Sequence, residues 1–373
     1  MTAAKRAWRI GWRIAVGALL LGWIVHSIFV NEARLAARQG RLFTADGQRV
    51  KWDSLERPTQ WRYGWRHGPP ALGKTLGSID PLPLALSFLL MGTTLLIGML
   101  RWRMALRVQG LDLSPARATE ISLVAHFFNS FLLGTAGGDM MKAYYAARET
   151  RHQKAEAVLA VFVDRLIGLW AMLLFAGLMI LPNLGLFAQS GLRTAAAVVV
   201  LMMVTASALA FLAFRGGVSK AWSGARLWLR RLPKGEWLER TLDACRRWGG
   251  EPWFLSRAMG YSMALNFVCV LQFWVVAHGL GIEVPLRVLC LVVPMIICIA
   301  ALPITPSGLG VRENLFVQLL AAPSIGISPT PALSLSLLAY AGSLFWSLIG
   351  GVVYVTLRER HHLTEAELEG LKT

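Results

Sequence analysis

Runs of about 20 predominantly apolar residues dominate this chain of 373 residues. Because an α-helix rises 1.5 Å per residue, each such run is long enough to cross the roughly 30 Å hydrocarbon layer of a bilayer. Charged residues make up only 16% of the chain, whereas about 25% is usual in soluble domains. The sequence therefore predicts an all-α polytopic membrane protein.

The formal net charge of +17 raises the question of nucleic-acid binding. However, the Lys and Arg residues cluster beside the apolar runs rather than along one helical face. Such placement is typical of the positive-inside rule and of attraction to anionic lipid headgroups. We therefore expect no nucleic-acid partner. The four cysteines lack CxxC spacing, and three lie in apolar segments, so we expect no metal or disulfide chemistry.

About six full spans are expected. Basic residues precede the first run, which predicts a cytoplasmic N-terminus and a first span within residues 1–30. Arg101, Arg103 and Arg107 follow the second run and are expected to return the chain to the cytoplasm, where the tail at 358–373 is also expected. The spans are expected at about residues 10–30, 81–100, 158–181, 192–214, 258–280 and 331–357.

A polar insert at 31–80 separates the first two spans, and we expect it on the extracytoplasmic side. Within it, residues 42–52 alternate between apolar and polar types around Asp46-Gly47, which is a strong hairpin signal. A small outer β element is therefore predicted. The remaining transmembrane domain is expected to cover 81–357.

Two further apolar runs are interrupted. The run from 117 breaks at Gly134 to Asp139, and the run from 288 breaks in the Pro- and Gly-rich stretch 303–310. The loop at 215–256 is strongly basic and is expected in the cytoplasm, which requires the first interrupted run to enter and leave on one side. Both runs are therefore predicted to form re-entrant hairpins, with both chain termini cytoplasmic.

Non-helical backbone at membrane depth must be buried in protein or line a wet cavity, because its N–H and C=O groups need partners. Two interrupted segments at corresponding places are typical of inverted-repeat transporters, which bind substrate near the midplane. The sequence thus predicts an inverted repeat around a cavity.

Gly137, Gly138 and Asp139, followed by Lys142, could present backbone N–H groups beside a cation, a combination that binds phosphate. The alternatives are tight helix packing for the glycines and a simple pair between Asp139 and Lys142. Either interpretation is open from the sequence.

Asp164 and Arg165 lie inside an apolar span, where each charge costs about 2.5 to 3.5 kcal/mol on insertion scales. Neighbouring helical positions diverge by about 100°, so the two are expected to reach different partners. Arg165 either holds a lipid phosphate, with Asp164 orienting it or balancing its charge, or belongs to a structural ion-pair network.

Further polar residues lie near the breaks. Arg312 is expected near the outer mouth, where it either receives a headgroup or pairs with Glu313. His126 and Asn129 lie before the first break, and a satisfied core histidine is favoured over a proton carrier. The sequence contains no HExxH, GxSxG or Walker motif, so we expect no enzyme, cofactor or metal.

Three motifs in order resemble those of a known family: FFNSFLLGTAGGDMMKAY at 127–144, VDRLIG at 163–168 and PITPSGLGVRE at 303–313. The chain resembles the lysylphosphatidylglycerol synthase transmembrane, or flippase-like, family over about residues 82–357. Leu133 stands where the family usually has proline. The insert at 31–80 lies outside the common pattern.

In the best-understood members the membrane region is thought to flip aminoacylated phosphatidylglycerol, while a separate soluble domain attaches the amino acid. That synthase domain is not seen here, so the resemblance implies translocation of an anionic-headgroup lipid, a phospholipid, glycolipid or polyprenyl phosphate, across the bacterial inner membrane. A separately encoded lipid-modifying enzyme is a possible partner. The alternative is a noncatalytic membrane partner or scaffold of envelope-lipid enzymes. The expected substrate-binding residues are Asn129, Gly137, Gly138, Asp139, Lys142, Asp164, Arg165, Gly308, Gly310, Arg312 and Glu313.

Overall fold

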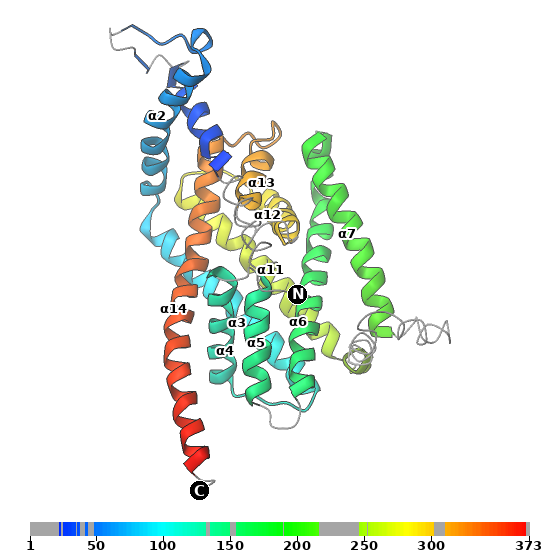
Figure 1. Cartoon of the computed structure of the whole chain (residues 1–373). Coiled ribbons are helices and arrows are strands. Elements are labelled where there is room, and N and C mark those ends of the chain that lie inside the picture. Colours follow the sequence, from blue (N-terminus) through cyan, green and yellow to red (C-terminus); the bar gives the residue numbers. More distant parts are fainter. Residues whose placement is uncertain are drawn as a thin grey trace, which may run out of the picture. The chain divides into compact units, whose positions relative to one another are not determined.

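The structure is a computed structural model, and helices make up most of what it describes (Figure 1). It describes residues 22–23, 25–34, 36–37, 42–43, 48–131, 135–149, 154–188, 190–215, 246–251, 253–301 and 310–370. The elements are η1 (Trp52–Ser54), α2 (Arg57–Gly77), α3 (Pro81–Val108), α4 (Pro115–Phe131), α5 (Thr135–Glu149), α6 (Lys154–Ile180), η2 (Leu181–Ala188), α7 (Ser190–Arg215), α11 (Phe254–Gly279), α12 (Leu286–Ala300), α13 (Val311–Leu320) and α14 (Pro329–Gly370).

Five helices among the described residues are long and apolar enough to cross a bilayer. They are α3, α6, α7, α11 and α14, and each overlaps one of the spans expected from the sequence. The sixth expected span, at about 10–30, lies largely outside the described residues. An all-α polytopic membrane architecture is therefore confirmed.

Several of these helices begin at proline, whose missing N–H is not needed in a first turn. Helix α3 begins at Pro81, α4 at Pro115 and α14 at Pro329. At α4 the Ser114 hydroxyl accepts a hydrogen bond from the Arg117 N–H at 3.2 Å, which is N-cap geometry.

The polar insert differs from its expected form. The predicted β-hairpin is reduced, among the described residues, to one isolated antiparallel bridge between Phe43 and Arg49, and Asp46-Gly47 lies outside them. Helix α2 instead occupies much of the insert and continues through Pro69 and Pro70. Each proline removes a hydrogen bond to the carbonyl four residues earlier, and those carbonyls belong to exposed residues that water can reach.

Helix α2 packs against the helical residues 25–34 through two glycines. A Cβ at Gly64 or Gly68 would collide with Val30 or with the ring of Phe29, so only glycine permits this approach. The Trp65 indole also donates a hydrogen bond to His26 Nδ1 at 3.0 Å. These contacts hold the insert together as a helical element.

The chain divides into two compact units. One comprises Met1–Ser87, Asn183–Ala195 and Val270–Gly342, and the other comprises Phe88–Pro182, Ala196–Cys269 and Ser343–Thr373. The α12–α13 pair belongs to the first unit and the α4–α5 pair to the second. Along the chain each pair of short helices stands between two long ones, in the orders α3, α4, α5, α6 and α11, α12, α13, α14.

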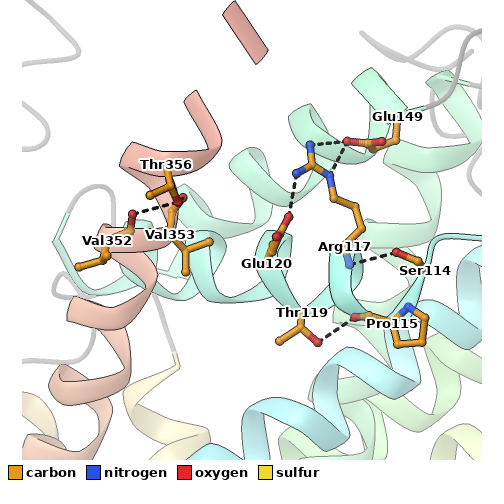
Figure 2. A network of polar contacts seen from close by, with 9 residues as sticks. All are labelled: Ser114, Pro115, Arg117, Thr119, Glu120, Glu149, Val352, Val353 and Thr356. Atoms are coloured by element: carbon orange, nitrogen blue, oxygen red, sulfur yellow. Dashed lines mark hydrogen bonds and ion pairs between the residues drawn. The ribbon is translucent and has the colours of Figure 1, made fainter. Parts of the chain in front are cut away.

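Helices α4 and α5 form an antiparallel hairpin with polar contacts between the two helices at both ends. At its base, Arg117 near the start of α4 reaches Glu149 at the end of α5, with the Arg117 Nε 2.7 Å from a carboxylate oxygen, and also contacts Glu120 (Figure 2). Toward its tip, the Asn129 side-chain oxygen accepts a hydrogen bond from the Gly138 N–H at 2.9 Å. The start of α4 and the end of α5 therefore lie at the same end of the hairpin.

Candidate functional site

Five charged side chains gather inside the second unit, and we call them the charged cluster. They come from α3, α5 and α6: Arg101, Asp139, Lys142, Asp164 and Arg165. The structure thus brings together four residues that the sequence nominated. It adds Arg101, which the sequence analysis placed only among the residues that orient the chain.

Asp164 is the centre of the charged cluster and is 7% exposed. One carboxylate oxygen accepts a hydrogen bond from Arg101 Nε at 2.8 Å, and the Arg101 Nη1 donates to the Ser262 hydroxyl of α11, also at 2.8 Å. A Cβ at Gly168, one turn after Asp164, would lie 2.8 Å from the Arg101 guanidinium. Asp164 and Gly168 therefore hold the Arg101 guanidinium on one face of α6: Asp164 accepts its hydrogen bond, and Gly168 leaves room for it.

Lys142 of α5 approaches the same carboxylate from another side. Its Nζ lies 3.7 Å from Asp164 Oδ2 and 4.3 Å from the ring centroid of the fully buried Trp102. A cation over an indole face is attracted by the negative face of the ring. Trp102 and Asp164 together position the Lys142 ammonium.

Asp139 and Arg165 form the loosest and most accessible pair of the charged cluster. Their closest atoms are 3.5 Å apart, and the side chains are 33% and 36% exposed. Asp164 and Arg165 thus have different partners, and Lys142 and Asp139 pair across helices rather than with each other. This pair is therefore reachable from outside the protein core, unlike the pair of Arg101 and Asp164.

The charge of the cluster does not balance. Among the described residues, three cationic side chains face two carboxylates, so one positive charge is left over. Asp139 lies ten residues before the end of α5, and Asp164 lies ten residues after the start of α6. Asp139 therefore lies roughly 15 Å from the end of α5, and Asp164 roughly 15 Å from the start of α6.

Three nominated residues before and at the start of α5 have packing roles. Asn129 engages the Gly138 N–H, and a Cβ at Gly138 would collide with the Ala125 carbonyl. Gly137 is buried as well. These contacts favour the tight-packing interpretation of the glycines. His126 Nε2 lies 3.1 Å from the Ser343 carbonyl, which agrees with a satisfied core histidine.

The nominated residues of the second break lie in the first unit. Glu313 is fully buried, accepts a hydrogen bond from the Gly310 N–H at 2.7 Å and is ion-paired with Arg312. The Arg312 guanidinium also lies 4.2 Å from the Tyr340 ring centroid. Glu313 thus pairs with Arg312, which was one of the two alternatives, and Gly308 lies outside the described residues.

Arg101, Ser262 and Gly168 were not predicted as site residues from the sequence. Arg101 and Arg103 are two residues apart, so they point about 160° apart around α3 and cannot share one environment. That divergence, together with the need of Asp164 for a cation, was the available signal for Arg101. Gly168 follows Asp164 by four residues and therefore lies on the same face of α6.

The chain is similar in sequence to known membrane proteins. Residues 61–351 match the model of a family described as the lysylphosphatidylglycerol synthase TM region. A UPF0104 membrane protein of Methanothermobacter thermautotrophicus is 25% identical over 311 residues, which cover 75% of this chain and 86% of the relative. A UPF0104 membrane protein of Pyrococcus horikoshii is 24% identical over 315 residues, covering 79% and 93%.

Proposed function

The chain belongs to the lysylphosphatidylglycerol synthase transmembrane family, and from this premise we propose that it moves an anionic-headgroup lipid between the leaflets of a bacterial inner membrane. The observation that carries the proposal is the leftover positive charge of the charged cluster. The family membership supports a lipid-related role and leaves the lipid open.

An unbalanced charge at membrane depth is expensive, on the order of 2.5 to 3.5 kcal/mol on insertion scales. A lipid phosphate carries one negative charge and would balance the cluster. Guanidinium and ammonium groups are the side chains that bind phosphate best, through charge-assisted hydrogen bonds. The cluster is therefore suited to a phosphate that arrives and leaves, rather than to a permanent ion pair.

The depth of the cluster supports the same conclusion. Roughly 15 Å along a helix is half of the roughly 30 Å hydrocarbon layer. If the end of α5 and the start of α6 lie at the membrane surface, Asp139 and Asp164 lie near the midplane. The α4–α5 hairpin, fastened at its base by Arg117 and Glu149, then enters and leaves from one side as a re-entrant hairpin. Midplane sites at broken helices are typical of transporters.

Arg165 is the residue best placed to exchange partners. Its pair with Asp139 is longer and more exposed than the pair between Arg101 and Asp164. We infer that Arg165 and Lys142 bind the headgroup phosphate, while Arg101 and Asp164 hold the framework. Both side chains are partly exposed, so a headgroup can reach Arg165 without displacing a buried contact.

The test is leaflet exchange in vesicles that contain the reconstituted protein. Fluorescent phosphatidylglycerol and fluorescent phosphatidylcholine are followed by chemical bleaching of the outer leaflet. We expect protein-dependent exchange of the anionic lipid, and we expect Lys142→Met to abolish it. That substitution removes the leftover charge and leaves the contact between Arg101 and Asp164 in place.

Folding is checked in parallel by thermal unfolding of each protein in detergent. Full exchange by folded Lys142→Met would overturn the role of the leftover charge. Absence of exchange by the wild-type protein for both lipids would overturn translocation and favour the noncatalytic membrane partner instead.

A further inference from the structure

A second positively charged site lies in the same unit, on a different face of α3. A pocket of about 480 Å³ is formed by the last turns of α3 and the first turns of α11, and we call it the arginine pocket. Its lining includes Arg103, Met104, Arg107, Arg257, Gly260 and Tyr261. Arg103 and Arg107 are one turn apart and share a helix face, whereas Arg101 points to Asp164.

The arginine pocket carries more positive charge than its partners neutralise. Asp112 pairs with both Arg107 at 2.9 Å and Arg103 at 3.2 Å. Arg257 is exposed, and the described part of the chain offers its side chain no hydrogen-bonding or ionic partner. Three guanidinium groups therefore face one carboxylate, which leaves two positive charges and one unengaged Arg side chain.

The shape and lining of the pocket fit a headgroup with an attached chain. A Cβ at Gly260 would meet open space, so the missing side chain contributes to the volume of the pocket. Leu100 and Met104 supply apolar surface beside the arginines. Arginine beside apolar surface suits an anion that carries a hydrocarbon tail, because the guanidinium binds phosphate and the tail buries apolar area.

The position along the helices also fits a membrane surface. The pocket lies where α3 ends and α11 begins, and basic residues flank both of these spans. Arg and Lys near span ends attract anionic lipid headgroups. We propose that the arginine pocket binds a phosphate-bearing group, supplied by an anionic lipid or by free phosphate, through Arg257 and separately from the charged cluster.

The full-length protein in detergent is titrated with phosphatidylglycerol or phosphatidylcholine, and bound lipid is counted by native mass spectrometry. We expect a phosphatidylglycerol site in the wild-type protein that Arg257→Gln weakens about tenfold, since one charge-assisted hydrogen bond is lost. Gly260→Leu fills the pocket from an open position and is expected to weaken the same site.

Matched controls come from outside the pocket. Arg193→Gln removes another exposed arginine, and Gly73→Leu fills another helical glycine position with open space around it. Both are expected to retain wild-type binding. Lys142→Met is expected to keep the phosphatidylglycerol site in the arginine pocket, and any site that it loses belongs to the charged cluster. Failure of this proposal can thus be distinguished from failure of the proposed function.

Addition of inorganic phosphate distinguishes the two sources of the ligand. Displacement of phosphatidylglycerol identifies the phosphate group alone as what the pocket recognises, and retention of the lipid identifies the whole lipid. Equal phosphatidylglycerol binding by the wild-type, Arg257→Gln and Gly260→Leu proteins would overturn the proposal.

Discussion

The two pairs of short helices resemble each other in chain order but differ in their charged residues. Near the start of the second helix of each pair, a glycine is followed within three residues by an acid: Gly138 before Asp139 in α5, and Gly310, the N-cap of α13, before Glu313. In α13, one cation and one acid, Arg312 and Glu313, pair with each other, so their charges balance. Around α5 the charged cluster spreads over three helices and keeps one positive charge in excess.

This difference separates two uses of a broken helix. A balanced pair of neighbours, capped onto the backbone as Glu313 is onto Gly310, fixes the local conformation and needs no ligand. In an unbalanced group with one loose pair, on the function proposed above, a lipid phosphate supplies the balancing negative charge and Arg165 exchanges Asp139 for it. We therefore expect substitutions of Arg312 or Glu313 to change stability alone, and substitutions in the charged cluster to change lipid exchange as well.

Asp164→Asn should give the largest effect. It leaves Arg101 and Lys142 buried without their common acid, and removing one partner of a buried pair costs about 3 to 5 kcal/mol. The free energy of unfolding, measured by SDS titration in mixed micelles, should fall by that amount. The double variant Arg101→Met/Asp164→Leu should recover much of it, since an apolar replacement leaves fewer buried charges; a double variant as unstable as Asp164→Asn would contradict the pairing.

Glu313→Gln should have the next largest effect, and only on stability. It weakens the charge-assisted bonds to Arg312 and Gly310, which are worth about 1.5 to 3 kcal/mol when an ionised group takes part. Exchange of phosphatidylglycerol per folded molecule should remain at the wild-type rate. A specific loss of exchange at unchanged stability would erase the distinction between the two pairs.

Gly168→Ala should cost about 1 to 2 kcal/mol through steric overpacking. The new Cβ would lie 2.8 Å from an Arg101 guanidinium nitrogen, which is held in place by Asp164 and Ser262. The control is Gly98→Ala, whose Cβ would lie an ordinary 3.6 Å from Leu265. Thermal unfolding should show a lower stability for Gly168→Ala and no loss for Gly98→Ala. Equal stability of the two variants would contradict the close packing of Gly168 against Arg101.

Asp112 provides the smallest effect, as an exposed contrast to the buried acids. A hydrogen bond from Arg107, together with the charges of Arg107 and Arg103, lowers the pKa of Asp112 from its usual value of 3.8. Its contribution to stability is therefore present above pH 3.8 and is lost as the pH falls through the lowered pKa. Wild-type and Asp112→Asn proteins should differ slightly in melting temperature at pH 5 and coincide at strongly acidic pH; a difference that grew on acidification would contradict this sign.

The five spans found in the described residues could be predicted because hydropathy over about 20 residues directly reflects the cost of leaving water. Helix starts at Pro81 and at Ser114-Pro115 were also local signals. Helix α2 could not be predicted in this way, because Pro69 and Pro70 argue against a helix and the supporting contacts with Phe29 and Val30 come from another segment.

The candidate site was predictable only in part for the same reason. Asp164 and Arg165 stood out because charge inside an apolar run is costly. Their partners lie on other helices, so the pairing of Asp164 with Arg101 and of Arg165 with Asp139 depends on packing that no local pattern reports. At Gly138, the N–H that the phosphate interpretation would use is engaged by Asn129, which favours the tight-packing interpretation.

Leaflet exchange by Arg165→Leu tests the central claim most directly. The wild-type, Arg165→Leu, Arg165→Lys and Arg312→Leu proteins are reconstituted at equal density, and folding is confirmed by thermal unfolding. Arg165→Leu should lose exchange of phosphatidylglycerol while remaining folded, and Arg165→Lys should recover only part of it because an ammonium lacks the bidentate geometry of guanidinium. Arg312→Leu should exchange lipid at the wild-type rate per folded molecule. Normal exchange by folded Arg165→Leu would contradict the assignment of headgroup binding to the charged cluster.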